Sequence, residues 1–311
     1  MRTQGRLVVS PRTLKPISQR ASPLAIWSAL SAVYLIWGST YLAIRFTVET
    51  TPPFLSAAGR FVISGAFLCV WRSFAGDPYP SREEWRNASI IGIFLLVGGN
   101  GGVVWASQFI PSSLAALLVA TVPLWMILFD ALHHGDKPGR AALGGICIGF
   151  CGAVLLVGWT ASHASVEHLH GAIAVLVASC LWAIGSIYSK TAKLPSSPLV
   201  TTGIEMVVGG IVLIFVASCF GELGHFDLAA ISPRSALAWL YLTVIGPAAF
   251  VAYAWLLRNA PIPLVATYSY VNPLVAILLG HFLGNEILTP RILLAASLII
   301  GSVVLVSKTG R

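Results

Sequence analysis

The sequence predicts an all-α integral membrane protein of ten transmembrane helices, built as two inverted five-helix repeats. Three observations predict this fold: the composition, the number of apolar runs, and a similarity between the two halves of the chain. Of the 311 residues, 57% are hydrophobic and only 10% are charged, whereas a soluble domain carries roughly 25% charged residues. So much apolar sequence must face lipid, and the charges lie mainly between the apolar runs and at the chain ends.

A helix that crosses a bilayer needs about 20 mostly apolar residues. Ten stretches meet this requirement, and several are joined by very short links, such as Phe109–Ile110 and Asn259–Pro261, that force neighbouring helices to run antiparallel. The predicted spans are 24–44, 54–72, 87–108, 111–132, 141–159, 171–189, 198–220, 236–257, 262–283 and 290–307. Residues 1–23 hold five Lys and Arg, no acid and no long apolar run, which predicts a disordered basic tail.

The distribution of Lys and Arg predicts the orientation, because cytoplasmic loops carry an excess of both. With the N-terminus inside, 15 of these residues fall in inner segments and 3 in outer segments. We therefore expect a multi-pass protein of a cell inner (plasma) membrane with both termini in the cytoplasm, so that residues 1–23 form a cytoplasmic tail.

The two halves of the chain match at fixed offsets. Shifting by 150 residues places Pro123 on Pro273 and Asp136 on Glu286, and shifting the earlier spans by 145 places Trp37 on Trp182. The predicted units are a first repeat at 24–159, an external linker at 160–170 and a second repeat at 171–307. Because five is an odd number, the second repeat enters the membrane from the opposite side. Inverted repeats are typical of secondary transporters, whose substrate site lies near the midplane between the copies.

Four segments, in this order, resemble the EamA family of the drug/metabolite transporter superfamily. They are WGSTYLAIRF (Trp37–Phe46), PPFLSAAGRF (Pro52–Phe61), SSLAALLVATVPLW (Ser112–Trp125) and YVNPLVAILLGHFLGNE (Tyr270–Glu286). The resemblance extends over nearly all of the chain beyond the tail. It implies ten helices in two EamA repeats, a central cavity, and export of amino acids, metabolites or drugs. Many relatives carry a glutamate where this chain has Asp136, which keeps the charge but has a shorter side chain.

The ninth span contains the first candidate site. Pro273 removes a backbone N–H and clashes with the carbonyl of Ser269, so we expect a helix kink there and at its counterpart Pro123. Three polar or aromatic residues immediately precede this kink, and we expect them to line a cavity: Tyr268, Tyr270 and Asn272. The alternative is that Pro273 only bends the helix while Asn272 bonds to a neighbouring helix.

The third span contains Asn100 within a cluster of four glycines. Glycine weakens a helix and permits close backbone approach, so this segment is either a flexible cavity wall with one polar contact or a tight packing surface. Further cavity candidates are aromatic or polar residues in the first, third, fourth, sixth and eighth spans: Trp37, Tyr41, Trp105, Trp125, Trp182, Ser186 and Tyr253. Trp37 and Trp182 lie deeper than an interfacial aromatic belt would.

Two ionisable residues lie inside the spans, Arg60 and Glu205, each seven residues after an entry proline and so about 10 Å deep. Burying such groups is costly, which makes them functional candidates. The inverted topology places them on opposite sides of the midplane. Arg60 either snorkels outward or serves the site; Glu205 either binds a substrate amine or a proton, or pairs locally with Lys190 or Lys193.

These observations predict a secondary transporter that exports small metabolites, such as amino acids or related amphiphilic compounds, by alternating access around a central cavity. A drug or multidrug efflux carrier is the alternative, and an integral-membrane enzyme or a channel is less favoured. HExxH, serine-elbow and P-loop motifs are absent from the sequence. We therefore predict no catalytic residue, metal site, cofactor or nucleic-acid partner; the expected partners are the lipid bilayer and a small-molecule substrate, with a monomer and a homodimer both open.

Overall fold

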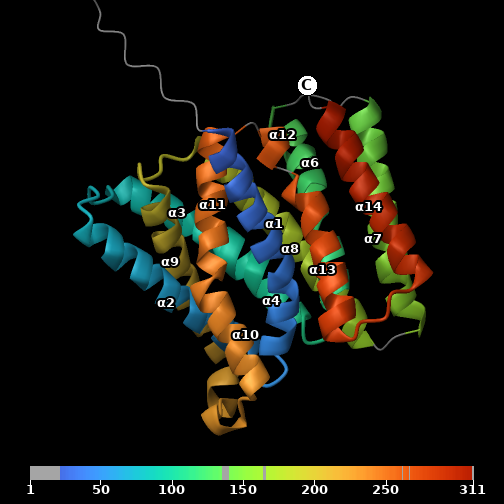
Figure 1. The fold of residues 1–311 in the computed structure, drawn as a ribbon, viewed down its shortest axis with the longest axis horizontal. Helices are drawn as coiled ribbons and strands as arrows, with labels where there is room; N and C mark the ends of the chain where they lie inside the picture. The colour runs from blue at the N-terminus through green and yellow to red at the C-terminus, as the bar shows by residue number, and fades with distance from the viewer. Residues whose placement is uncertain (1–21, 135–139, 164–165, 261, 266, 310–311) are drawn as a thin grey trace, which may run out of the picture.

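The structure of the chain is a computed structural model that describes residues 22–134, 140–163, 166–260, 262–265 and 267–309. Helices account for all the regular structure in this part of the chain (Figure 1). The helices are α1 (Pro23–Thr47), α2 (Pro53–Phe74), α3 (Arg82–Gly92), the π-helix η1 (Ile93–Gly101), α4 (Gly102–Ala106), α5 (Ser112–Val119), α6 (Val122–His134), α7 (Arg140–His163), α8 (Val166–Thr191), α9 (Pro198–Cys219), the short 3₁₀ helices η2 (Glu222–His225) and η3 (Leu228–Ala230), α10 (Pro233–Val244), α11 (Gly246–Asn259), α12 (Ile262–Val265), α13 (Tyr268–Gly284) and α14 (Pro290–Thr309).

Most of the predicted spans correspond to segments that are long and apolar enough to cross a membrane. Within the described residues there are seven: Pro23–Thr47, Pro53–Phe74, Arg82–Ala106, Ser112–Phe129, Val166–Thr191, Pro198–Cys219 and Pro233–Leu256. The other three predicted spans contain shorter apolar helices, Leu143–Leu155, Val271–Gly284 and Pro290–Leu305. The predicted all-helical class is confirmed, whereas the number of ten spans stays a prediction.

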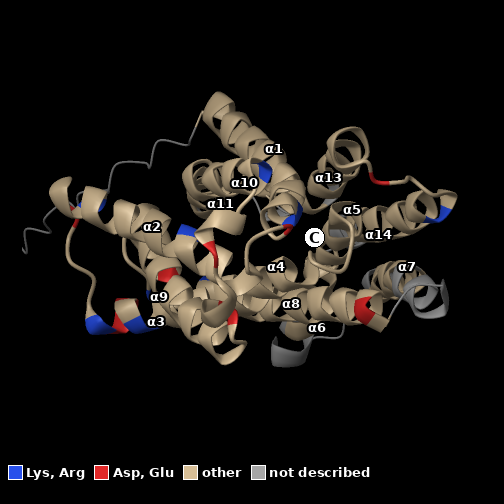
Figure 2. Ribbon diagram, turned by 90° about the horizontal axis from the view of Figure 1, so that it is seen from below, with Lys and Arg blue, Asp and Glu red and all other residues tan. Residues whose placement is uncertain are grey.

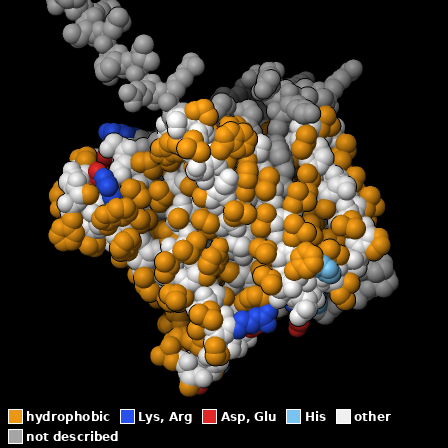
Figure 3. Space-filling view, in the orientation of Figure 1, with side chains coloured by type: hydrophobic (Ala, Val, Ile, Leu, Met, Phe, Trp, Pro, Cys, Tyr) orange, Lys and Arg blue, Asp and Glu red, His pale blue; other side chains and the backbone are white. Residues whose placement is uncertain are grey.

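The surface has the distribution of polarity that a bilayer requires. Hydrophobic side chains cover the lateral face shown in Figure 3, and charged side chains lie near its edges. Figure 2 shows few charged residues, most of them at helix ends. We call the side on which α1 begins and α14 ends the terminal side, and the side on which α1 ends the opposite side (Figure 1).

Some helix boundaries differ from the prediction. α3 begins at Arg82, five residues before the predicted span, because Ser81 and Glu84 form a capping box that satisfies its first N–H groups. α7 continues to His163 and α8 begins at Val166, so helix occupies much of the predicted linker at 160–170. The predicted tail lies outside the described residues except for Ser22, which caps α1, and Pro23, which begins it.

Helices that correspond to each other in the two halves of the sequence pack together or make corresponding contacts. α2 packs against α9, and α7 packs against α14. α1 contacts α11 and α13, while its counterpart α8 contacts η1 and α6, which correspond to α11 and α13 in the other half. The contacts of one half are therefore repeated with the halves exchanged.

An acid that follows each of α2 and α9 contacts the start of the other helix. The Glu222 carboxylate, which follows α9, accepts hydrogen bonds from the backbone N–H groups of Phe54 (3.2 Å) and Leu55 (2.8 Å) in the first turn of α2. Its counterpart 145 residues earlier, Asp77, follows α2 and bonds to Ser197 before α9. Carboxylates are favourable at helix N-termini. The Arg72 hydrogen bond and then the Ser197 bond lower the pKa of Asp77, whereas burial raises the pKa of Glu222.

Candidate functional site

Five aromatic side chains meet at the centre of the bundle around Trp37 of α1. We call them the aromatic cluster: Trp37, Trp182, Phe250, Tyr253 and Tyr268. The Trp37 ring centroid lies 5.0 Å from that of Tyr253, 5.3 Å from those of Phe250 and Tyr268, and 6.0 Å from that of Trp182. These residues come from four helices of both halves, so the cluster joins the halves at one point.

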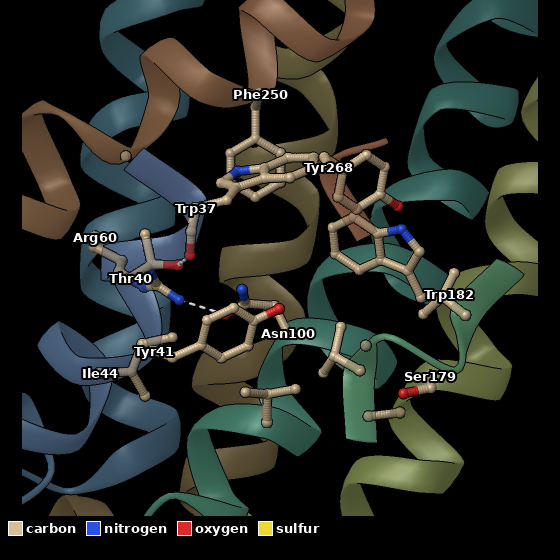
Figure 4. A pocket seen from close by; sticks show the side chains of 16 residues that line it. Trp37, Thr40, Tyr41, Ile44, Arg60, Asn100, Ser179, Trp182, Phe250 and Tyr268 are labelled. Carbon is tan, nitrogen blue, oxygen red and sulfur yellow. Dashed lines mark hydrogen bonds between the residues drawn. The ribbon is translucent and has the colours of Figure 1, made fainter. Parts of the chain in front are cut away.

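A small cavity of about 70 Å³ lies on one side of the aromatic cluster. We call it the Arg60 cavity; Figure 4 shows Arg60, Asn100, Tyr41, Thr40 and Ser179 around it. Ile44 also lines it and directly precedes Arg45, which lies on the opposite side. The cavity is thus bounded by polar groups on one wall and by aromatic rings on another.

Arg60 points into the bundle and does not snorkel outward. Its residue is only 4% exposed. Its guanidinium donates a hydrogen bond to Oδ1 of Asn100 (Figure 4). It also stacks over the Phe61 ring, 4.4 Å from the centroid. The Arg60 head group is therefore held at the cavity wall by one amide oxygen and one ring face.

The position of Asn100 depends on the glycine cluster around it. A Cβ atom on Gly99 would come within 2.8 Å of Trp182, and one on Gly98 within 2.7 Å of Leu181. The glycines thus let η1 lie against α8, and the segment is a π-helix, a form that is frequent at functional sites. This segment packs tightly while Asn100 reaches the cavity; the flexibility of this wall stays a prediction.

A larger cavity of about 490 Å³, which we call the vestibule, lies on the other side of the aromatic cluster. Its polar lining comprises Ser186, Ser189, Lys190, Thr201, Thr202 and Glu205. Lys190 and Ser189 lie at the end of α8 on the terminal side, so the vestibule faces that side. Trp182, Phe250 and Tyr268 line both cavities and form the partition between them.

Glu205 has no hydrogen bond or ion pair within the described part of the chain. Of its expected partners, Lys193 pairs instead with Glu83 at 3.3 Å. Lys190 lines the same vestibule as Glu205 without an ion pair between them among the described contacts. The Glu205 carboxylate is therefore directed to the vestibule rather than neutralised by a lysine.

On the opposite side, Glu286 closes the bundle by capping α5. Its carboxylate accepts hydrogen bonds from the backbone N–H groups of Ser112 (2.7 Å) and Ser113 (3.0 Å) and from both hydroxyls (2.7 and 2.5 Å). It also pairs with Arg45 at 2.5 Å. Burial raises the pKa of Glu286, but the bonds from Ser113 and Ser112 together outweigh it and leave the pKa lowered. We call this group the Glu286 cap.

Three predicted cavity residues lie elsewhere. Trp105 packs on Phe109 with ring centroids 4.9 Å apart, and Trp125 packs on Phe150 at 4.8 Å. Asn272 is 3% exposed and contributes to neither cavity among the described residues. Its backbone oxygen lies close to Gly38, where α13 contacts α1.

The two predicted kink positions differ. Pro123 is the second residue of α6, directly after a helix interruption at Ala120–Thr121, and it lines the vestibule. Pro273 lies inside α13, and the interruption of its span falls earlier, before Tyr268. The side chain of Tyr270 lies outside the described residues. The structure brings the other predicted residues together, with Trp37, Tyr41, Arg60 and Asn100 at the Arg60 cavity, Ser186, Glu205 and Tyr253 at the vestibule, and Trp182 and Tyr268 at both.

Sequence reasoning missed Phe250 and the serine pair of the Glu286 cap. Phe250 lies 150 residues after Asn100, so the repeat offset could have found it. Ser112 and Ser113 carried no comparable signal, because their partner is more than 170 residues away.

An apolar helical bundle that encloses polar and aromatic cavities between its two halves defines a polytopic membrane protein with internal cavities. The chain belongs to the EamA-like transporter family, whose model matches residues 24–158 and again residues 169–308. It is 39% identical over 287 residues to the "Uncharacterized inner membrane transporter YedA" of Escherichia coli (strain K12), covering 91% of each chain. It is 24% identical to "Protein PagO" of Salmonella typhimurium, covering 86% of this chain and 88% of that one. A solved crystal structure, 21% identical, has a likeness of fold with TM-score 0.64, covering 93% of this chain and 99% of that chain.

Proposed function

We propose that this protein is a secondary transporter that moves small metabolites across an inner membrane by alternating access. One observation carries the proposal: Trp182, Phe250 and Tyr268 line both cavities, so a single layer of rings separates them. The vestibule faces the terminal side, while the Glu286 cap holds the opposite side together. A ligand that displaced the rings would pass from one cavity to the other without a continuous pore.

The proposed machinery is a pair of inverted five-helix repeats, with both termini in the cytoplasm. The exchanged helix contacts support it, as do the bonds of Glu222 to the first turn of α2 and of Asp77 to Ser197 before α9. The two separate family matches also support it. Two similar units in opposite orientations give two packings of similar energy, each open to one side.

The proposed cargo is a small, weakly charged metabolite such as an amino acid or a related amphiphile, and the proposed direction is export. The aromatic cluster offers ring faces, and each cavity contributes few charged groups. A cationic drug is the second candidate, favoured by the Glu205 carboxylate in the vestibule, which has no ion-pair partner among the described residues.

Solute exchange in proteoliposomes tests the proposal. Labelled amino acids, their amides and cationic dyes would be offered to vesicles with and without the same unlabelled solute inside. We expect internal solute to accelerate uptake of one class, since only a carrier is stimulated from the far side. Uptake that does not change with internal solute would contradict a carrier and favour a channel. Uptake equal to that of protein-free liposomes for every class of solute would contradict the proposal.

A further inference from the structure

Arg60 is a buried cation without a negatively charged partner among the described residues. The only hydrogen bond its guanidinium makes there is to Asn100, although a guanidinium has five N–H donors. The ring of Phe61 covers one face of the group. The other guanidinium N–H groups of Arg60 make no hydrogen bond among the described residues, and the Arg60 side chain lines the cavity.

Three described acids on the same side of the membrane have other partners, and two more, Glu167 and Asp227, are exposed at the surface. Glu286 is taken by Arg45 and the serine pair, and Glu222 by the first turn of α2. Glu49 lies 3.7 Å from Arg234. Glu205 lines the vestibule beyond the aromatic partition. A small rearrangement of the described side chains would therefore not bring a negative charge to Arg60.

A buried and uncompensated guanidinium destabilises the fold unless a further interaction offsets its lost hydration. Asn100 supplies a neutral oxygen where a carboxylate would supply a charged one. A carboxylate matches the planar guanidinium with two parallel bonds and is roughly twice as strong a partner as a neutral acceptor. The Arg60 guanidinium thus has the environment of an anion-binding site, and the amide oxygen of Asn100 occupies the position that an anion would take.

We propose that Arg60 is the anion-binding group of the Arg60 cavity, that Asn100 is its placeholder, and that the ligands are small organic carboxylates, zwitterionic amino acids included. The proposal deepens the transporter function proposed above and rests on it. A single basic residue fits a monocarboxylate, whereas a phosphate dianion would need several. The body of the ligand would lie against Trp37, Trp182 and Tyr268, which line the same cavity.

Changing Asn100 to Asp separates this proposal from a purely structural role of the pair. In N100D the protein would carry its own carboxylate against Arg60 and so imitate the bound ligand. If Arg60 and Asn100 only tie α2 to η1, the change strengthens that tie and affects all ligands alike. If they form the anion site, it expels carboxylates selectively.

The experiment measures binding to the full chain in detergent by tryptophan fluorescence, supported by thermal shift. The probes are a matched series: isobutyrate, L-valine, L-valinamide and isobutylamine. We expect the wild-type protein to bind isobutyrate and L-valine at least about tenfold more tightly than the two compounds without a carboxylate. N100D should lose this preference and show a higher melting temperature without ligand.

Two further variants complete the design. Gln108→Glu adds the same charge to the same span, at an exposed position outside the cavity, and should bind as the wild type does. Arg60→Met should also lose the preference; if it does not fold, N100D carries the test. No binding, no preference for carboxylates in the wild type, or equal losses for all four probes in N100D would overturn the proposal.

The same probes distinguish a failure of this proposal from a failure of the transporter function. A carboxylate preference that N100D abolishes, in a protein that moves none of the probes in proteoliposomes, would leave the anion site standing and remove the transport function. If isobutylamine and isobutyrate exchange at equal rates, and these rates are unchanged in N100D, the result would support a transporter and contradict the anion site.

Discussion

At the scale of single residues, Trp182 is the side chain whose loss should affect function most directly. It lines both cavities and packs against Trp37. We expect Trp182→Ala to lower the exchange rate per molecule in proteoliposomes by about tenfold or more, since truncation both merges the cavities and removes a ring face. Trp182→Phe should keep most of the activity.

Trp105→Ala is the matched control for that prediction. Trp105 lies in the same bundle but packs on Phe109 and lines neither described cavity. Its truncation should lower the melting temperature, as a lost aromatic contact does, while leaving the exchange rate per folded molecule within about twofold. Equal losses of exchange in the two variants would contradict the assigned role of Trp182.

Sequence reasoning identified where a residue lies along its span but not the direction in which its side chain points. The position of Arg60 in its span gave its depth, yet its partner Asn100 lies 40 residues away on another span. Nothing local distinguishes an arginine that snorkels from one that turns inward. For the same reason Trp37 and Trp182 were identified from their position along the span, whereas Trp105 and Trp125 have the same chemistry but pack on Phe109 and Phe150.

At the scale of elements, the Glu286 cap should stabilise the fold in a pH-dependent manner. Glu286→Gln keeps the shape but removes the charge from the start of α5 and from Arg45, and charge-assisted hydrogen bonds contribute about 1.5–3 kcal/mol each. We expect a melting temperature lower by several degrees near pH 7. Because the folded-state pKa of Glu286 is lowered, its contribution is present above the ordinary glutamate pKa and lost as pH falls through the folded value.

Glu222→Gln is the control variant, because the stability contribution of Glu222 should change with pH in the opposite direction to that of Glu286. Burial raises the pKa of Glu222, so its contribution is present below the ordinary glutamate pKa and is lost as pH rises through the folded value. Melting curves between pH 3 and pH 7 should show the wild-type advantage over Glu286→Gln growing with pH, and the advantage over Glu222→Gln shrinking. Parallel curves for both variants would contradict the assigned roles.

The elements themselves were predictable from apolar runs, but their interruptions were not. The third predicted span contains the π-helix η1, and its counterpart is broken at Ile245 between α10 and α11. A hydropathy average detects neither the π-helix nor the break at Ile245, because the residues of both are mostly apolar. The glycines around Asn100 gave the local signal for η1, whereas Gly246 and Pro247 gave the signal for the second break and were not used.

At the scale of the whole molecule, a similar framework carries different chemistry in its two halves. Phe250 stands where the other half has Asn100, and Ile262 and Pro263 stand where it has Ser112 and Ser113. The polar contacts that tie the opposite side together are therefore not available in the same form on the terminal side. The larger of these two cavities lies on that side, and the Glu286 cap is formed on the other.

Cysteine labelling from each side of the membrane tests this arrangement. Ser189 lines the vestibule at the end of α8, and Gly224 lies on the opposite side with open space around it. After replacement of the five native cysteines, we expect a membrane-impermeant maleimide to label Ser189→Cys only in inside-out vesicles and Gly224→Cys only in right-side-out vesicles. The reverse pattern would contradict cytoplasmic termini.

Adding Glu286→Gln to these single-cysteine proteins extends the test from topology to alternating access. The two packings of a carrier exclude each other, so weakening the contacts that close one side should populate the state that closes the other. A loss of about 1.4 kcal/mol from the Glu286 cap shifts that equilibrium tenfold. The labelling rate at Ser189→Cys should then fall severalfold, while Gly224→Cys, which lies outside both cavities, labels as before. An unchanged rate at Ser189→Cys would mean that the two sides open independently, as in a channel with two gates.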